Sequence, residues 1–315
     1  MFAARGIAVS LSVFVMVYGA LSVAVCLGWH TVWVHSQRNA VRLADLLFAL
    51  RMFPLASAAA ITVAFTVPSF LLLEPRAINE PIGGIPMVLG ICGAGLGVFG
   101  LGNAAIALCR ASRAISTWTS DAQPFESCVP VPVLRIPQAV PALTAAGIVR
   151  PTVLLSGAAE SMLTAGELQT ALNHEIAHVS RGDNLKKLLL RLPAFPGMRA
   201  LESAWLEATE MAADDAAVSS AEEALDLASA LIKLSRLGPV EPPVDLTAAL
   251  VHSPVCVMNL RIERLIRWSD ERPGPRLRFS PWYGMSLLAV TVGVFAVTYS
   301  PLLIGVHTAT EWLVR

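Results

Sequence analysis

Long apolar stretches separated by short polar segments dominate both ends of the chain. Four of them have the length of roughly 20 apolar residues that a helix needs to cross the hydrocarbon core of a bilayer. They comprise residues 6–29, 52–73, 85–108 and 282–306. The first has no charged residue and no small-x-small cleavage site, so we interpret it as a retained span rather than a secretory signal. The pattern therefore predicts four transmembrane helices.

The pattern changes between the third and fourth stretches, where shorter apolar runs alternate with polar positions. β-Branched runs at residues 131–136 and 151–155 are flanked by prolines and predict two short strands, at least one of them at a sheet edge. Thr164 and Glu167 have the spacing of a capping box, and the helical periodicity that follows ends near Gly182. Further helices are predicted at residues 184–192, 198–219 and 221–237.

These elements predict a mainly α-helical membrane protein with an α+β domain inserted between the third and fourth spans. The predicted regions are residues 1–113 with three spans, residues 114–280 forming the inserted domain, and residues 281–315 with the fourth span. Composition agrees, since 15% of the residues are charged, against about 25% in a typical soluble domain. The formal net charge is zero, so we expect no basic surface for direct nucleic-acid binding.

Arginines beside the apolar stretches predict the orientation, because loops rich in Lys and Arg stay in the cytoplasm. The first loop carries Arg38, Arg42 and Arg51, while Arg110 and Arg113 follow the third span. We therefore expect a multi-pass protein of the cell inner membrane. The first loop and the inserted domain face the cytoplasm in this prediction, and both termini lie outside.

Glycine and cysteine patterns in the chain are interpreted as packing features. A G-x-G-x-x-G pattern at residues 95–100 resembles a dinucleotide-binding loop, but it lies within an apolar stretch with no strand before it. Gly93 and Gly97 have instead the spacing that lets transmembrane helices approach closely. The five cysteines lack metal-binding spacings, and a bridge between Cys128 and Cys256 is left open.

The first predicted helix of the inserted domain contains a candidate metal site. His174 and His178 are four residues apart, so both imidazoles lie on one helix face and can bind the same ion. Glu175 lies between them, where its carboxylate can take a proton from a metal-bound water. An isolated HExxH match also fits two histidines beside a surface acid. We predict that His174 and His178 bind one zinc ion per chain and that Glu175 is the general base.

A catalytic zinc ion usually has three protein ligands, and the acidic helix at residues 198–219 is expected to provide the third. Glu210 and Asp214 are four residues apart, with alanines between them that permit close helix packing. We predict Glu210 as the ligand and Asp214 as the acceptor of a histidine ring N–H, which fixes the tautomer. Glu202 and Asp215 fit better as acids on a solvated face.

Taken together, these motifs resemble a known family. An HExxH helix that runs into an Arg-x-Asp-Asn segment, followed by a later Glu-x-x-Ala-Asp, resembles the BlaR/MecR-type membrane zinc metallopeptidases, which cleave repressors. The related HtpX and CAAX-protease type peptidases share the HExxH and Glu-x-x-Ala-Asp elements. The matching segments are residues 147–155, 174–184 and 210–214. The resemblance, which includes the layout of spans, implies a zincin-like (gluzincin) fold for the cytoplasmic domain.

The resemblance also implies a function. It predicts a membrane zinc metalloendopeptidase that cleaves a cytoplasmic protein, with a transcriptional repressor as the expected substrate. Signalling members of the family carry a penicillin-binding sensor after the fourth span, whereas this chain ends at Arg315, so β-lactam sensing is not expected. The related peptidases have a His-Pro segment and an Arg-Ile pair, similar to His252-Ser-Pro254 and Arg261-Ile262. Either His252 or Arg261 is a hypothesis for the oxyanion donor, against a surface histidine and a salt-bridged arginine.

We expect the substrate to lie extended along an edge strand near residues 149–155, where backbone hydrogen bonds give affinity. The alternatives are a quality-control peptidase for membrane proteins, a non-catalytic signalling scaffold with a retained zinc site, and a transporter. Glu175 argues against the scaffold, since a structural site needs no base. The uncharged spans argue against the transporter. The expected partners are a protein or peptide substrate and the lipid bilayer, and the oligomeric state is open.

Overall fold

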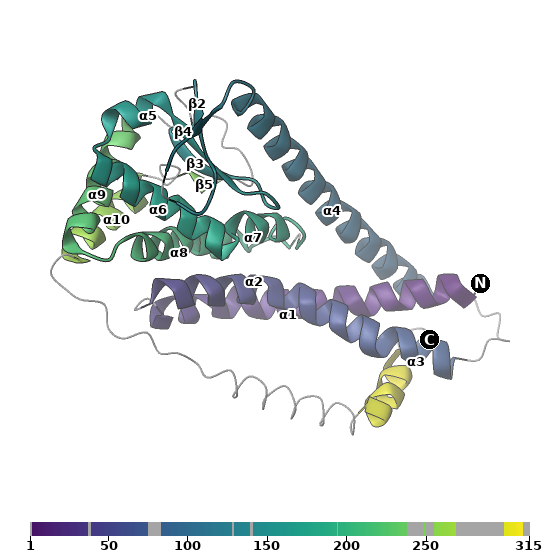
Figure 1. Cartoon of the computed structure of the whole chain (residues 1–315). Coiled ribbons are helices and arrows are strands. Elements are labelled where there is room, and N and C mark those ends of the chain that lie inside the picture. Colours follow the sequence, from purple (N-terminus) through teal and green to yellow (C-terminus); the bar gives the residue numbers. More distant parts are fainter. Residues whose placement is uncertain are drawn as a thin grey trace. The chain divides into compact units, whose positions relative to one another are not determined.

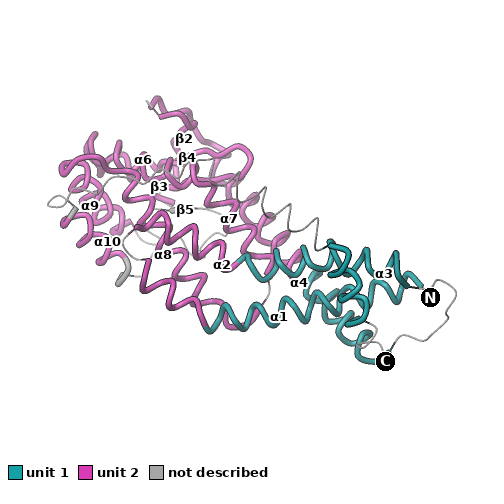
Figure 2. Tube along the Cα trace, turned by 90° about the horizontal axis from the view of Figure 1, so that it is seen from below, with its two compact units in different colours: residues 1–27, 52–99, 274–315 teal, residues 28–51, 100–273 magenta. Residues whose placement is uncertain are grey.

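The computed structural model describes residues 2–36, 39–74, 83–127, 129–138, 141–193, 195–237, 248–249, 255–268 and 299–310. The chain, drawn in Figure 1, forms two compact units, which Figure 2 shows in different colours. The first comprises residues 1–27, 52–99 and 274–315, and the second comprises residues 28–51 and 100–273. Residues 28–36, 40–51 and 100–118, which are parts of three long helices, therefore belong with the second unit. The predicted boundary after residue 113 had placed nearly all of them with the spans.

Among the described residues, three helical stretches are long and apolar enough to cross a membrane. They are α1 (Phe2–Ser36), α4 (Gly84–Trp118), and the stretch that α2 (Ala40–Ile61) forms with η1 (Thr62–Thr66) and α3 (Val67–Leu73). The first three predicted spans are thus confirmed as helices, which indicates a membrane protein. The fourth, at residues 282–306, lies mostly outside the described residues, and its described part, residues 299–306, is helical.

Glycines let α1 and α4 approach closely within the first unit. A Cβ atom at Gly93 would lie 3.1 Å from the Leu11 carbonyl oxygen, and one at Gly90 would lie 3.2 Å from Ala8 Cα. A Cβ atom at Gly97 would meet no heavy atom of the described residues within 4 Å. The predicted packing role is therefore confirmed for Gly93, whereas Gly90 rather than Gly97 shares it.

A five-stranded sheet lies in the second unit, with the strand order β1-β2-β4-β3-β5. β2 and β4 pair in parallel, and the other neighbours are antiparallel. The strands are β1 (Gln123–Phe125), β2 (Val133–Ile136), β3 (Leu143–Ala146), β4 (Thr152–Ser156) and β5 (Ala248–Ala249). β2 and β4 correspond to the two strands predicted from the sequence.

The prediction that one of these two strands forms a sheet edge is wrong. β2 lies between β1 and β4, and β4 lies between β2 and β3. The prolines leave the ladder intact, because Pro132 and Pro151 immediately precede the strands. The Pro132 carbonyl even accepts a hydrogen bond from the Val153 amide at 2.9 Å. A substrate along residues 149–155 would therefore find no free backbone edge at β4.

The second unit also contains helices that match most of the sequence prediction. α6 begins with both hydrogen bonds of the predicted capping box and ends at Gly182, whose φ of 64° is left-handed. The same glycine precedes α7, so one residue joins the two helices. In chain order the helices are α5 (Gly157–Met162), α6 (Ala165–Arg181), α7 (Asp183–Leu189), α8 (Arg199–Ala217), α9 (Ala221–Ser235) and α10 (Val255–Trp268).

The main core lies between the sheet, α6 and α9. Val153 and Leu155 of β4 are fully buried, as are Leu227 and Leu231 of α9, and Leu172 of α6 is 2% exposed. Fully burying one such side chain contributes about 1.5–3 kcal/mol. Figure 1 shows the sheet on one side of α6 and α8 on the other. Because α6 is packed on two sides, its polar residues have fixed positions.

Candidate metal centre

The two histidines of α6 face each other in the interior of the second unit. His174 and His178 are 0% and 3% exposed. Their Nε2 atoms lie 3.1 Å apart, and the planes of the two rings meet at 79°. The structure therefore brings together the two imidazoles that the sequence spacing had placed on one helix face.

Each histidine uses its other nitrogen to contact a buried carboxylate. His174 Nδ1 lies 3.0 Å from Asp214 Oδ1, and His178 Nδ1 lies 2.8 Å from Asp183 Oδ2. Carboxylates accept hydrogen bonds, so both Nδ1 atoms carry a hydrogen, and the two facing Nε2 atoms can share one proton or bind a metal ion. Sequence reasoning gave Asp214 this role but missed Asp183, although its place directly after Gly182 at the helix end was a usable signal.

Glu210 brings a third group to the same point from α8. Its Oε2 lies 3.6 Å from His174 Nε2, and its Oε1 lies 3.6 Å from His178 Nε2. Ala208 and Ala212, which flank it on α8, are fully buried, and these small residues allow α8 to lie close to α6. Of the other acids considered from the sequence, Asp215 pairs with Arg264 at 2.7 Å, outside this cluster.

The arrangement of these three groups fits a bound cation. Two imidazole nitrogens and a carboxylate lie this close together only with a positive charge among them, which is a proton on one Nε2 atom or a metal ion. The candidate ligand atoms all lie within 4.8 Å of one another. A tetrahedral zinc ion with bonds of about 2.0–2.1 Å holds its ligand atoms about 3.3 Å apart, close to the spacing here. His174, His178 and Glu210 could therefore hold a metal ion.

Glu175 is fully buried beside this cluster and is held by β3. Its Oε2 accepts a hydrogen bond from the Ala145 amide at 2.6 Å. Its Oε1 has no hydrogen-bond partner among the described residues. Burial raises the pKa of the Glu175 carboxyl to about 8, and Glu210 adds to this effect. One carboxylate oxygen is thus anchored, while the other remains available to a small polar molecule.

The electrostatics of the cluster favour positive charge. Burial opposes a charged imidazole, yet Asp214 and Glu210 raise the pKa of His174 to about 9. Burial also opposes a charged Glu210 carboxyl, but Arg261 and the two histidines outweigh it and lower its pKa to about 2. The pKa of Asp214 is likewise lowered, chiefly by Arg261 against the effect of burial. Two ionised carboxylates therefore lie next to the paired imidazoles.

The sequence left two roles open for Arg261, an oxyanion donor and a salt-bridged arginine. In the structure Arg261 is salt-bridged. It reaches the cluster from α10, is 1% exposed, and uses all three guanidinium nitrogens to contact Asp214 and Glu210. The guanidinium nitrogens therefore contact carboxylates, which argues against Arg261 as the oxyanion donor. The other candidate donor, His252, lies outside the described residues, as do Cys128 and the side chain of Cys256.

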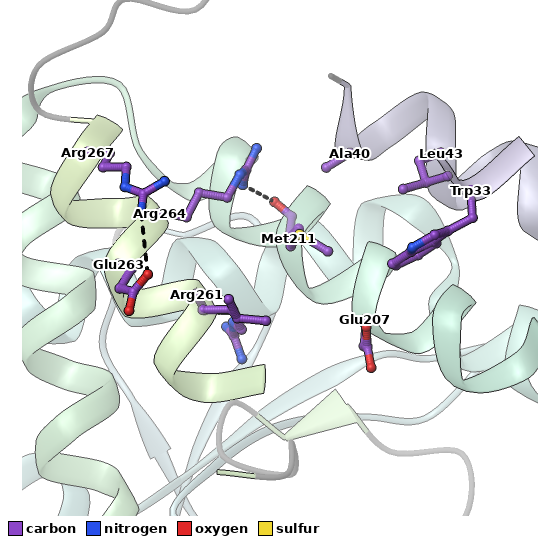
Figure 3. A pocket seen from close by; sticks show the side chains of 10 residues that line it. Trp33, Ala40, Leu43, Glu207, Met211, Arg261, Glu263, Arg264 and Arg267 are labelled. Carbon is purple, nitrogen blue, oxygen red and sulfur yellow. Dashed lines mark hydrogen bonds and ion pairs between the residues drawn. The ribbon is translucent and has the colours of Figure 1, made fainter. Parts of the chain in front are cut away.

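A cavity of about 490 Å³ lies beside Arg261, which is one of its lining residues. The ends of α1 and α2 line it on one side, and α8 and α10 line it on the other. Figure 3 shows Glu207 and Met211 from α8 together with Arg261 and Arg264 from α10. Burial raises the pKa of the Glu207 carboxyl. Glu207 therefore belongs to this cavity rather than to the group of candidate ligands.

No protein-family model matches the chain, and no curated protein matches it.

Proposed function

We propose that the chain is a membrane-embedded zinc metalloendopeptidase with His174, His178 and Glu210 as the metal ligands. The observation that carries the proposal is the pair of facing Nε2 atoms, 3.1 Å apart and each 3.6 Å from a Glu210 oxygen. Two imidazoles and one carboxylate form a ligand set that suits zinc and leaves a position open for a reactant.

Glu175 is the proposed general base. When bound, zinc acts as a Lewis acid for both a water molecule and the scissile carbonyl. Glu175 Oε1, which has no described hydrogen-bond partner, accepts the proton of the attacking water and later returns it to the leaving amine. The Ala145 amide holds Oε2 during both transfers. Asp214 and Asp183 keep both histidine tautomers correct for metal binding.

The cellular role follows from the resemblance to BlaR/MecR-type peptidases. In this proposal the second unit contains the zincin-like domain and faces the cytoplasm from the inner membrane. Its substrate is a cytoplasmic protein, with a transcriptional repressor preferred over misfolded membrane proteins. The three membrane-type helices found among the described residues support a membrane location for the enzyme.

The decisive test is hydrolysis of casein by full-length protein in detergent, with zinc measured in the same samples. Wild type is compared with Glu175→Ala and with Glu222→Ala, which removes an exposed carboxylate on α9. We expect cleavage by wild type and by the Glu222 variant, no cleavage by the Glu175 variant, and one zinc ion in each. Equal cleavage by the Glu175 variant would remove Glu175 from the mechanism.

The main rival is a non-catalytic scaffold that retains the metal. Zinc in all three proteins without cleavage of casein, or of any of a set of cytoplasmic repressors, would favour that rival. Absence of zinc from wild type would contradict the proposal at its base.

A further inference from the structure

α10 brings one arginine into the interior of the second unit. Arg261 is 1% exposed, and its guanidinium contacts two carboxylates on α8. Nε lies 2.8 Å from Asp214 Oδ2, Nη2 lies 2.7 Å from Asp214 Oδ1, and Nη1 lies 2.9 Å from Glu210 Oε2. Asp214 in turn lies beside His174. One side chain therefore contacts both a candidate ligand and the residue that orients another ligand.

The geometry of these contacts is directional. A guanidinium is planar, and its donors form a fixed fork that matches the two oxygens of a carboxylate. Asp214 occupies that fork, and the remaining nitrogen, Nη1, forms an ion pair with Glu210 Oε2 at 2.9 Å. Glu210 Oε1 then stays beside His178 Nε2, at 3.6 Å. The arginine distinguishes the two oxygens of Glu210, which a mobile cation would not do.

We propose that Arg261 is a positioning residue of the metal centre. By holding Glu210 Oε2, it makes Glu210 a ligand through Oε1 alone, and by holding Asp214 it fixes the imidazole of His174. This inference rests on the proposed metal function and adds to it. A carboxylate that offers one oxygen leaves a coordination position for water, whereas one that offers two fills that position.

Positioning and charge predict opposite changes in metal affinity. A cation this close to the site repels a divalent ion, so if charge were the whole role of Arg261, its loss would tighten metal binding. If Arg261 positions the ligands, its loss weakens metal binding, because residues that orient ligands typically contribute about 10–100-fold. Lysine at this position keeps the charge but cannot form the fork, so it separates the two effects.

The experiment compares full-length wild type with Arg261→Lys and Arg261→Gln in detergent. Competition with a chelator gives the affinity for Zn²⁺, and the visible absorption of the Co²⁺-loaded protein reports the coordination number. We expect both variants to bind Zn²⁺ about 10–100-fold more weakly. We also expect weaker Co²⁺ absorption, because Glu210 becomes able to offer both oxygens.

Arg264→Lys and Arg264→Gln are the matched controls. Arg264 lies one turn further along α10 and bonds to the Met211 carbonyl (Figure 3) and to Asp215, outside the ligand cluster. Both control variants are expected to keep the wild-type Zn²⁺ affinity and Co²⁺ spectrum. A loss of affinity shared by these controls would mean that α10 acts only through general packing, which overturns the proposal.

Two other results would also overturn it while leaving the metal site intact. One is an unchanged affinity and spectrum in Arg261→Lys, and the other is tighter binding in Arg261→Gln. If Arg261→Gln does not fold, Arg261→Lys decides alone. A wild type that binds neither Zn²⁺ nor Co²⁺ contradicts the proposed function itself, and the role of Arg261 fails with it.

Discussion

Two buried carboxylates on the same helix have opposite surroundings. Glu167, in the first turn of α6, is 5% exposed and accepts hydrogen bonds from Ser229, Lys233 and the backbone of its own N-cap residue. Glu175, further along α6, is fully buried and accepts one hydrogen bond, from Ala145. Its second oxygen has no hydrogen-bond partner among the described residues.

The two environments shift the carboxyl pKa values in opposite directions. Burial works against ionisation of Glu167, but the bonds from Lys233, Ser229 and the N-cap backbone outweigh it and lower its pKa. For Glu175 burial prevails and raises the pKa to about 8. An acid with all its bonds made stabilises the fold. A buried acid that lacks part of its hydrogen bonds costs stability. Such an acid indicates that a further group contacts it only during function.

The largest expected effect is on peptide hydrolysis, which should depend on Glu175 and not on Glu167. Glu175→Gln is expected to lower peptide hydrolysis by about 10²–10⁴-fold, because an amide cannot accept the proton from water. Its melting temperature should equal or exceed that of wild type, since a neutral amide replaces a carboxyl whose ionisation burial opposes. Hydrolysis of casein and thermal unfolding of the same samples check both parts. A melting temperature well below wild type would show that Glu175 stabilises the fold as Glu167 does.

The second effect extends the comparison to Asp183, a carboxylate that contacts the proposed ligand His178. Asp183→Asn is expected to weaken Zn²⁺ binding by about 10–100-fold. The amide of asparagine can donate to His178 Nδ1, which favours the tautomer with its hydrogen on Nε2. Chelator competition measures the affinity, with Asp226→Asn on α9 as the control. Equal affinities in the two variants would show that Asp183 does not set the tautomer.

The third effect is on stability alone. Glu167→Gln is expected to lower the free energy of unfolding by about 1.5–3 kcal/mol, the typical contribution of hydrogen bonds to charged groups. Casein hydrolysis per folded molecule should stay at the wild-type level. Thermal unfolding in detergent measures the change, with the exposed Glu222→Gln as the control. A loss of activity per folded molecule would contradict the division between the two acids.

The smallest effect is the pH dependence of that stability. The folded-state pKa of Glu167 is lowered, so its contribution is present above the unfolded-state pKa, about 4.3 for Glu, and is lost as pH falls through the folded-state value. The difference in melting temperature between wild type and Glu167→Gln should therefore shrink below about pH 4. A difference that stays constant down to pH 3 would mean that the carboxylate charge is not what stabilises the turn.

Both ends of α6 could be predicted from the sequence because local residues determine them. The capping box at Thr164 and the left-handed Gly182 each act within a few positions of the chain. The spacing of His174 and His178 is equally local, and so is the spacing of Glu210 and its neighbour Asp214. Those parts of the candidate site were predicted from helix periodicity alone.

The rest of the site depends on contacts between distant segments. β3 has the sequence Leu-Thr-Ala-Ala, and alanine has a weak preference for strands. It becomes a strand by pairing with β4 and β5, and only then does Ala145 meet Glu175. Arg261 reaches Asp214 from another helix, across a separation of 47 residues. The position of β4 inside the sheet likewise depends on β3, which the sequence did not predict.

The single residue between α6 and α7 restricts how this protein can change over evolution. Gly182 turns the chain with a φ of 64°, and Asp183 follows immediately with its carboxylate 2.8 Å from His178 Nδ1. One residue inserted or deleted between His178 and Gly182 would rotate Asp183 by about 100° around the axis of α6 and remove that contact. Side chains on the outer face of this segment can vary, but its length cannot. An alignment of distant relatives should show it as a block without gaps.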